Sequence, residues 1–126
     1  MDRLVIVSQY IRNTYGDAWR WGQTDCGLWA AGWVASVTGV DPCAAYRGTY
    51  DTPFGCRRVV QRNGGMLTLT RAVMASFKRG EGDGVAIAKI DGRVICGLMS
   101  GGRLWVKGDG KNLSPAQYYI LDRWVL

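Results

Sequence analysis

The sequence predicts an α+β fold in which N-terminal helices, one of them a buried central helix, pack on a C-terminal antiparallel sheet. Up to Lys78, apolar residues recur at helical spacing, whereas short β-prone runs separated by glycine turns follow Gly80. Helices that precede strands along the chain are typical of α+β proteins. The 126 residues suit a single domain with its own core, which we place at residues 1–126.

The first helix is expected over residues 2–14, where apolar side chains recur at spacings of three and four, and Gly16 ends it. Residues 17–24 contain two tryptophans but no periodicity, which predicts an ordered loop. The central helix is expected over residues 25–38, since no charge follows Asp25 and a glycine stop follows the run. A helix that is apolar on every side is wrapped by other elements, so this one forms the centre of the core.

Three further helical segments are expected before the sheet. An Asp-Pro pair at residues 41–42 is typical of a helix start and predicts a short helical turn that ends at Tyr46. A Thr-Pro pair at residues 52–53 repeats that signal and predicts a helix up to the stop at residues 63–65. An amphipathic pattern then predicts a helix over residues 66–78.

The sheet is expected to be a small meander. An Asp-Gly pair and a Gly-Gly pair separate the first three β-prone runs, and both pairs suit the tight turns of antiparallel hairpins. A loop or helical turn at residues 114–115 precedes the last run. The runs cover residues 85–90, 93–99, 103–107 and 119–126.

The formal net charge of +6 favours an acidic partner, whether nucleic acid, anionic lipid or an acidic protein surface. Six basic residues gather across two adjoining predicted helices, without the aromatic interleaving that stacks on single-stranded nucleic acid. We expect this basic face to dock on an acidic protein surface rather than on nucleic acid, although basic side chains also serve simply to solvate a surface. The residues are Arg57, Arg58, Arg62, Arg71, Lys78 and Arg79.

The first residues lack the long apolar run and cleavage site of a signal peptide, and no uncharged stretch reaches the ~20 residues that span a bilayer. We therefore expect cytoplasmic synthesis, no membrane span and four reduced cysteines. The sequence has no C-x₂-C pair of the kind typical of zinc and iron–sulfur sites, so we expect no metal and no cofactor. A metal site that uses Cys43 and Cys56 remains an alternative, because distant cysteines can converge in a fold.

Cys26, at the start of the predicted central helix, is the main candidate for chemistry. A thiolate is the reactive form of cysteine, and the positive end of a helix dipole lowers the thiol pKa. The alternative is that Cys26 is a small apolar residue that fills a gap in the core. Gln23 precedes it and suits an oxyanion donor, but a polar residue in such a turn more often satisfies loop backbone groups.

Longer motifs around this cysteine resemble those of NlpC/P60 peptidases, a papain-like family. The pattern W-x-W-G-x-T-D-C-G at residues 19–27 looks like the segment whose cysteine attacks an amide carbonyl in that family. The resemblance implies a papain-like fold with Cys26 at the nucleophile position and Asp25 beside it. Residues 82–87 resemble the family's Gly-Asp and first strand, and residues 38–42, 46–50 and 63–65 are similar to small NlpC/P60-like proteins encoded among phage tail genes.

The departure from the family lies in the next predicted strand. The peptidases have His-Val-Gly-Ile there, and the histidine takes the proton from the cysteine, whereas residues 95–98 here read Ile-Cys-Gly-Leu. Ile95 therefore stands where the base would be, and the whole chain contains no histidine. A carboxylate would serve only if burial raised its pKa toward neutrality, and Asp25 and Asp83 are the nearest candidates.

Two main hypotheses follow for the function. The first is a pseudoenzyme: a degenerate cysteine-peptidase fold that binds other tail proteins as a structural or assembly component of a phage tail, near the tail tip, in the virion. The alternative is an active papain-like amidase that acts on cell-wall peptides through Cys26, with a non-histidine base or a base supplied by a partner chain. A third hypothesis, nucleic-acid binding, predicts an affinity that falls steeply with salt.

Overall fold

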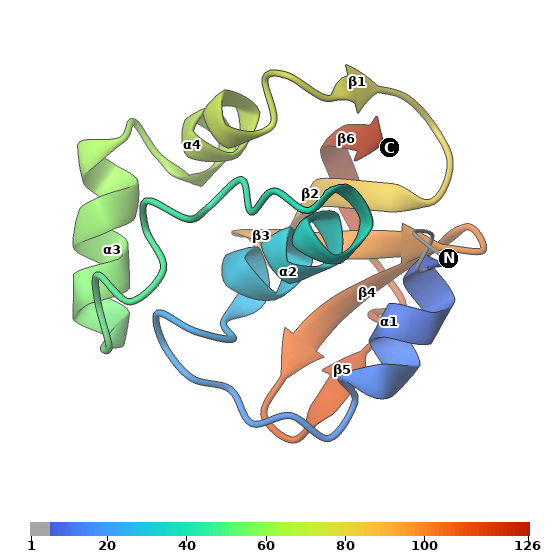
Figure 1. Cartoon of the computed structure of the whole chain (residues 1–126), viewed down its shortest axis with the longest axis horizontal. Coiled ribbons are helices and arrows are strands. Elements are labelled where there is room, and N and C mark those ends of the chain that lie inside the picture. The colour runs from blue at the N-terminus through green and yellow to red at the C-terminus, as the bar shows by residue number, and fades with distance from the viewer. Residues whose placement is uncertain (1–5) are drawn as a thin grey trace.

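The computed structural model describes residues 6–126, which form an α+β fold with four helices and one six-stranded antiparallel sheet (Figure 1). Along the chain every one of these helices precedes every strand, as the sequence predicts. Residues 1–5, in which the first predicted helix begins, lie outside the described residues. The helices are α1 (Val7–Asn13), α2 (Cys26–Thr38), α3 (Pro53–Arg62) and α4 (Met66–Val73); the strands are β1 (Lys78–Arg79), β2 (Gly84–Ile90), β3 (Arg93–Ser100), β4 (Arg103–Gly108), β5 (Lys111–Leu113) and β6 (Tyr119–Val125).

The sheet has the strand order β1-β6-β2-β3-β4-β5, and every neighbouring pair is antiparallel. Strands β2 to β5 follow one another as a meander, and β6 returns to the other side of β2. The predicted hairpins are confirmed: the Asp-Gly turn joins β2 to β3, and the Gly-Gly turn joins β3 to β4. Asp91 and Gly92 have φ angles of 49° and 77°, which match the twist of antiparallel strands.

The buried central helix that the sequence predicts is α2. The side chain of Asp25 accepts a hydrogen bond from the backbone of Leu28, and Gly39 ends the helix with a left-handed φ of 81°. The helix packs against β3 and β4 (Figure 1). The Tyr10 hydroxyl donates to the backbone oxygen of Trp29 at 2.7 Å and so ties α1 to α2. Neither α2 nor any other helix within residues 6–126 has the length and apolar character needed to cross a membrane.

The segment between α2 and α3 differs from the prediction. Residues 42–48 form successive turns instead of the short helical turn expected up to Tyr46. The carboxylate of Asp41 accepts from the Arg47 guanidinium at 2.8 Å, and the backbone N–H of Gly48 donates to the loop before α2. These contacts outside the segment hold it in a shape that local propensity does not favour.

Helix α3 begins as predicted, with the Thr52 hydroxyl accepting from the backbone of Gly55 at 2.9 Å. The helix expected over residues 66–78 is wrong in its second half, because α4 ends at Val73 and residues 74–77 form turns. The next two residues pair with the edge of β6 as β1, and that edge supplies backbone hydrogen bonds that the amphipathic pattern does not reveal.

Both faces of the sheet are buried. One face packs against α1, α2 and α4 and includes Ile87, Cys96 and Leu98. The other face buries a smaller cluster that includes Ala88 and Leu104. Because successive residues of a strand point to opposite faces, the register of β3 decides which of its side chains reach the helices.

Candidate functional site

Cys26 is the first residue of α2, and its side chain is partly buried. Burial raises the pKa of its thiol, and the neighbouring Cys96 and Asp25 raise this pKa further. A backbone hydrogen bond at the start of the helix acts in the opposite direction but has a smaller effect. The helix N-terminus therefore does not lower this thiol pKa as its position predicts, because desolvation of the thiolate outweighs the dipole.

Asp25 is a buried carboxylate with three hydrogen-bond donors. One oxygen accepts from the backbone of Leu28 at 3.2 Å; the other accepts from the backbone of Gly22 at 2.9 Å and from the Tyr50 hydroxyl at 2.7 Å. A side chain at position 22 would collide with the backbone oxygen of Tyr50, so glycine is needed there. Both oxygens are engaged, and the carboxylate joins the loop before α2, the start of α2 and the loop before α3.

Tyr50 links this carboxylate to α3. Burial and the hydrogen bond to Asp25 raise the pKa of the Tyr50 phenol, so it stays protonated and donates. Burial also raises the pKa of the Cys56 thiol, while a hydrogen bond with Tyr50 acts in the opposite direction. Sequence reasoning missed Tyr50, since a partner 25 residues away leaves no local pattern.

Strand β3 presents Cys96, not Ile95, to the helices. Cys96 belongs to the core cluster beneath α2, whereas Ile95 packs in the cluster on the opposite face of the sheet. The Cys96 sulfur lies 3.3 Å from the hydroxyl of Thr70 on α4, and burial raises its pKa to about 11. The side chain that β3 directs toward the helices at this level is therefore a thiol.

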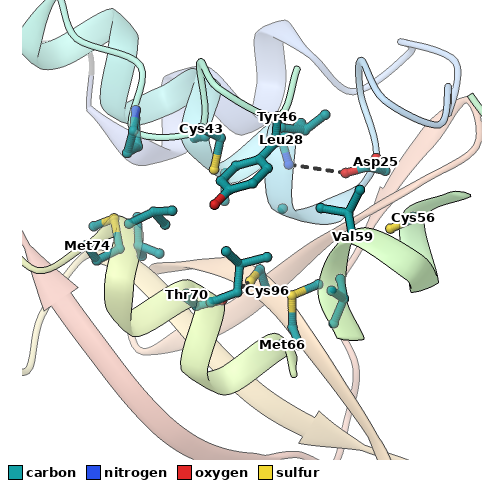
Figure 2. Close-up of a pocket in the computed structure, with 18 of the residues that line it drawn as sticks. Asp25, Leu28, Cys43, Tyr46, Cys56, Val59, Met66, Thr70, Met74 and Cys96 are labelled. Atoms are coloured by element: carbon teal, nitrogen blue, oxygen red, sulfur yellow. Dashed lines mark hydrogen bonds between the residues drawn. The ribbon is translucent and has the colours of Figure 1, made fainter. Parts of the chain in front are cut away.

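A mostly apolar cavity of about 70 Å³ lies among α2, α3, α4 and the loop before α3. Figure 2 shows Cys43 from that loop, Cys56 from α3 and Cys96 from β3 at separate points around it, with Met66 also on its wall. Burial raises the pKa of Cys43 to about 12. Three of the four cysteines that the sequence scatters over different elements thus converge on one cavity, as uncharged thiols at neutral pH.

The cavity wall includes Cys43 and Cys56, the two residues that the sequence leaves as candidate metal ligands. Within residues 6–126, no group of three or more potential ligand residues has an arrangement that could hold a metal ion. All four cysteines are free thiols.

Gln23 and Asp83 lie outside this cluster. Gln23 is exposed and sits in a turn, where its backbone oxygen accepts from a guanidinium at 2.8 Å. Asp83 is also exposed and accepts from the backbone of the β3–β4 turn at 3.0 Å. It precedes Ile87, the β2 partner of Cys96, by four residues, or about 13 Å of extended strand. The fold does not bring Asp83 to the sulfur atoms.

The six basic residues of the predicted face fall into two groups in the structure, those with an ion pair and those without one. Arg71 and Arg79 both pair with Asp122 on β6, at 2.8 and 3.0 Å. The arginines of α3, by contrast, are exposed and have no ion pair with any other residue in the 6–126 range. Of the six residues, those without an ion pair to the described part of the chain are Arg57, Arg58 and Arg62 on α3 and exposed Lys78 in β1.

Comparison with known proteins gives one match. A family model described as a domain of unknown function, DUF6950, matches residues 2–121, nearly the whole chain. No curated protein and no solved structure matches the chain.

Proposed function

We propose that this chain, which belongs to the DUF6950 family, is a degenerate papain-like domain of the NlpC/P60 type that binds other proteins as a component of a phage tail. We place it near the tail tip of the virion, after synthesis in the host cytoplasm. Asp25 and Cys26 are then vestiges of a catalytic site.

The arrangement of the elements supports the papain-like part of this proposal. A cysteine begins a buried helix, that helix packs against an antiparallel sheet, and the Gly-Asp-Gly at residues 82–84 leads into β2. This is the order that the resemblance to NlpC/P60 peptidases implies. Because a fold alone does not define a function, the binding role has to be argued from the site.

The observation that carries the non-catalytic part of this role is the setting of Cys26 at the start of α2, where burial and the neighbouring Cys96 raise its thiol pKa. A papain-like nucleophile needs a neighbour that accepts its proton. On the helix face of β3 the register supplies Cys96, whose own pKa is raised to about 11, and the sequence contains no histidine. The nearest carboxylate, Asp25, already accepts three hydrogen bonds. These contacts favour a protonated, unreactive Cys26.

The tail location is supported by residues 38–42, 46–50 and 63–65, which are similar to small proteins encoded among phage tail genes. The exposed arginines of α3 support a partner with an acidic surface. We therefore propose other tail proteins as the partners.

Two measurements test the proposed function. The first compares the purified protein with a Cys26→Ala variant for release of peptides from peptidoglycan fragments; we expect no difference. The second is quantitative mass spectrometry of purified phage particles and isolated tails; we expect the chain in a fixed ratio to other tail proteins. Turnover that Cys26→Ala abolishes would establish the amidase alternative, and absence of the chain from particles would contradict the tail location.

A further inference from the structure

A groove runs along α3 on the side that faces the loop before it. It encloses about 520 Å³, within the range of about 300–1,000 Å³ that is usual for ligand pockets. One wall carries Arg58 and Arg62 of α3, and the other carries Tyr46 and Tyr50 of the loop. We call this hollow the arginine groove and define it by Tyr46, Tyr50, Phe54, Arg58, Val59 and Arg62.

The two arginines of the groove are placed as a pair. They are four residues apart on one helix, so they share a face, with about 5–6 Å between their Cβ atoms. The guanidinium of Arg58 lies over the ring of Phe54, 5.9 Å from its centre. Stacking on a ring orients a guanidinium but leaves its in-plane N–H groups free to bind a carboxylate through two parallel hydrogen bonds.

The opposite wall is also fixed in place. The hydroxyl of Tyr46 donates to the side chain of Asn63 at 3.3 Å, and that of Tyr50 donates to Asp25 at 2.7 Å. Their rings therefore offer a preformed wall to a partner, while Phe54, with 63% of its surface exposed, adds apolar area at the edge of the groove. The one acid in the lining is Asp51.

The spacing of the arginines selects one kind of occupant. Alternate residues of an extended chain point to the same side and are about 6.7 Å apart, close to the roughly 5–6 Å expected between the Cβ atoms of the two arginines. Acidic residues at alternate positions would meet Arg58 and Arg62, and the residues between them would face Tyr46 and Tyr50. A nucleic-acid strand needs a longer basic track, and Arg71 and Arg79 are occupied by Asp122.

We propose that the arginine groove binds an extended segment of a partner protein in which acidic and apolar residues alternate. This proposal rests on the protein-binding role proposed above and specifies the partner chemistry for that role.

The test uses a fluorescein-labelled decapeptide of alternating leucine and glutamate, with binding to the full chain measured by fluorescence anisotropy at physiological salt. We expect saturable binding that weakens about tenfold or more in the double variant Arg58→Gln/Arg62→Gln, because both guanidinium groups lose their charge-assisted hydrogen bonds to carboxylates of the peptide. The matched control is Arg93→Gln/Arg103→Gln, which removes the same charge at exposed positions outside both the groove lining and the predicted basic face. We expect this control to change the affinity less than about twofold.

A second peptide, with five leucines followed by five glutamates, has the same composition without the alternation, and we expect it to bind more weakly. Three results would overturn the proposal: no saturable binding up to roughly 1 mM peptide, equal weakening by the two double variants, or tighter binding of a ten-residue oligothymidylate than of the alternating peptide. Thermal melts of both variants establish that they are folded. If the bound peptide is cleaved and the cleavage depends on Cys26, the proposed non-enzymatic function is wrong, but the proposal for the arginine groove stands. If the peptide does not bind, only the proposal for the arginine groove is wrong.

Discussion

The hydroxyl of Tyr50 donates a 2.7 Å hydrogen bond to the carboxylate of Asp25, the residue that caps the central helix. This one contact fixes both the start of α2, where Cys26 lies, and the loop that forms one wall of the arginine groove. The candidate catalytic position and the proposed binding surface therefore share a structural support.

Removing that hydroxyl should destabilise the domain. We expect Tyr50→Phe to lower the free energy of unfolding by about 1.5–3 kcal/mol, because a buried carboxylate oxygen loses one of its two donors. Urea unfolding followed by tryptophan fluorescence measures the effect. Tyr119→Phe is the control, since Tyr119 is 69% exposed, and a loss of equal size in this variant would show that the contact to Asp25 is not the cause.

Asp122 joins α4 to the edge of the sheet through two arginines. We expect Asp122→Asn to destabilise the domain by about 1 kcal/mol at pH 7, the upper end for an exposed ion pair, because both Arg71 and Arg79 lose their partner. Burial raises the pKa of Asp122, but the hydrogen bonds from Arg71, Arg79 and a backbone N–H together outweigh it and hold this pKa below its usual value of 3.8. Its contribution is therefore present above pH 4 and is lost as the pH falls through the lowered pKa.

Thermal melts of wild type and Asp122→Asn at several pH values check this prediction. The difference in melting temperature should be largest near neutrality and should shrink toward pH 2. Glu81→Gln, at an exposed carboxylate outside the ion pairs of the described chain, serves as the control. A difference that does not depend on pH would mean that Asp122 acts through packing and not through its charge.

Cys96 should make the domain sensitive to alkali. Burial raises the pKa of its thiol from 9.0 to about 11, so its neutral form contributes stability that is complete below pH 9 and is lost as the pH rises toward 11. Linkage between these two values gives a loss on the order of 1 kcal/mol at pH 10 relative to pH 7. Urea unfolding at both pH values should show a smaller loss for Cys96→Ala, by about that amount; identical pH slopes would contradict this assignment.

The elements with strong local signals could be predicted from the sequence. The Asp25 cap and the Gly39 stop define α2, the Thr-Pro pair defines the start of α3, and the glycine turns define the hairpins. Such signals act within a few residues, so the structure they specify does not depend on contacts with distant parts of the chain.

Features that depend on distant partners could not be predicted. The end of α4 and the strand β1 follow from pairing with β6, more than forty residues later. Two polar side chains hold this end of the sheet against α1. Asn112 of β5 donates from its side chain to the backbone of Ile11 at 2.7 Å. Lys107, buried on the neighbouring strand β4, donates to backbone oxygens just after the end of α1. Neither residue type is expected inside a core, and their acceptors lie more than ninety residues away in sequence.

The candidate site shows the same limit at finer scale. The resemblance to the peptidases matches Ile95 to their histidine, but it does not show which face of β3 each side chain lies on; the structure places Cys96 toward the helices and Ile95 on the opposite face. A shift of one residue in strand register exchanges the two faces, and a short sequence match does not define the register to that precision.

The reactivity of Cys26 bears directly on function. A native thiol with a raised pKa should alkylate with iodoacetamide at a rate that climbs tenfold for each pH unit and shows no plateau up to pH 10, because the thiolate is the attacking form. Mass spectrometry of digested protein measures the rate at each cysteine, with protein unfolded in urea as the reference. In urea the rate should level off near the ordinary thiol pKa of about 8.5.

The shape of this pH profile separates two reasons for slow modification. Poor access alone would lower the rate at every pH but would still give a plateau near the ordinary pKa, whereas a protonated thiol moves the plateau upward. Cys26 is partly exposed, so access is not closed. A plateau well below pH 8.5 would identify a thiolate stabilised by its surroundings, and Cys26 would then have to be treated as a nucleophile with a base that the contacts of residues 6–126 do not reveal.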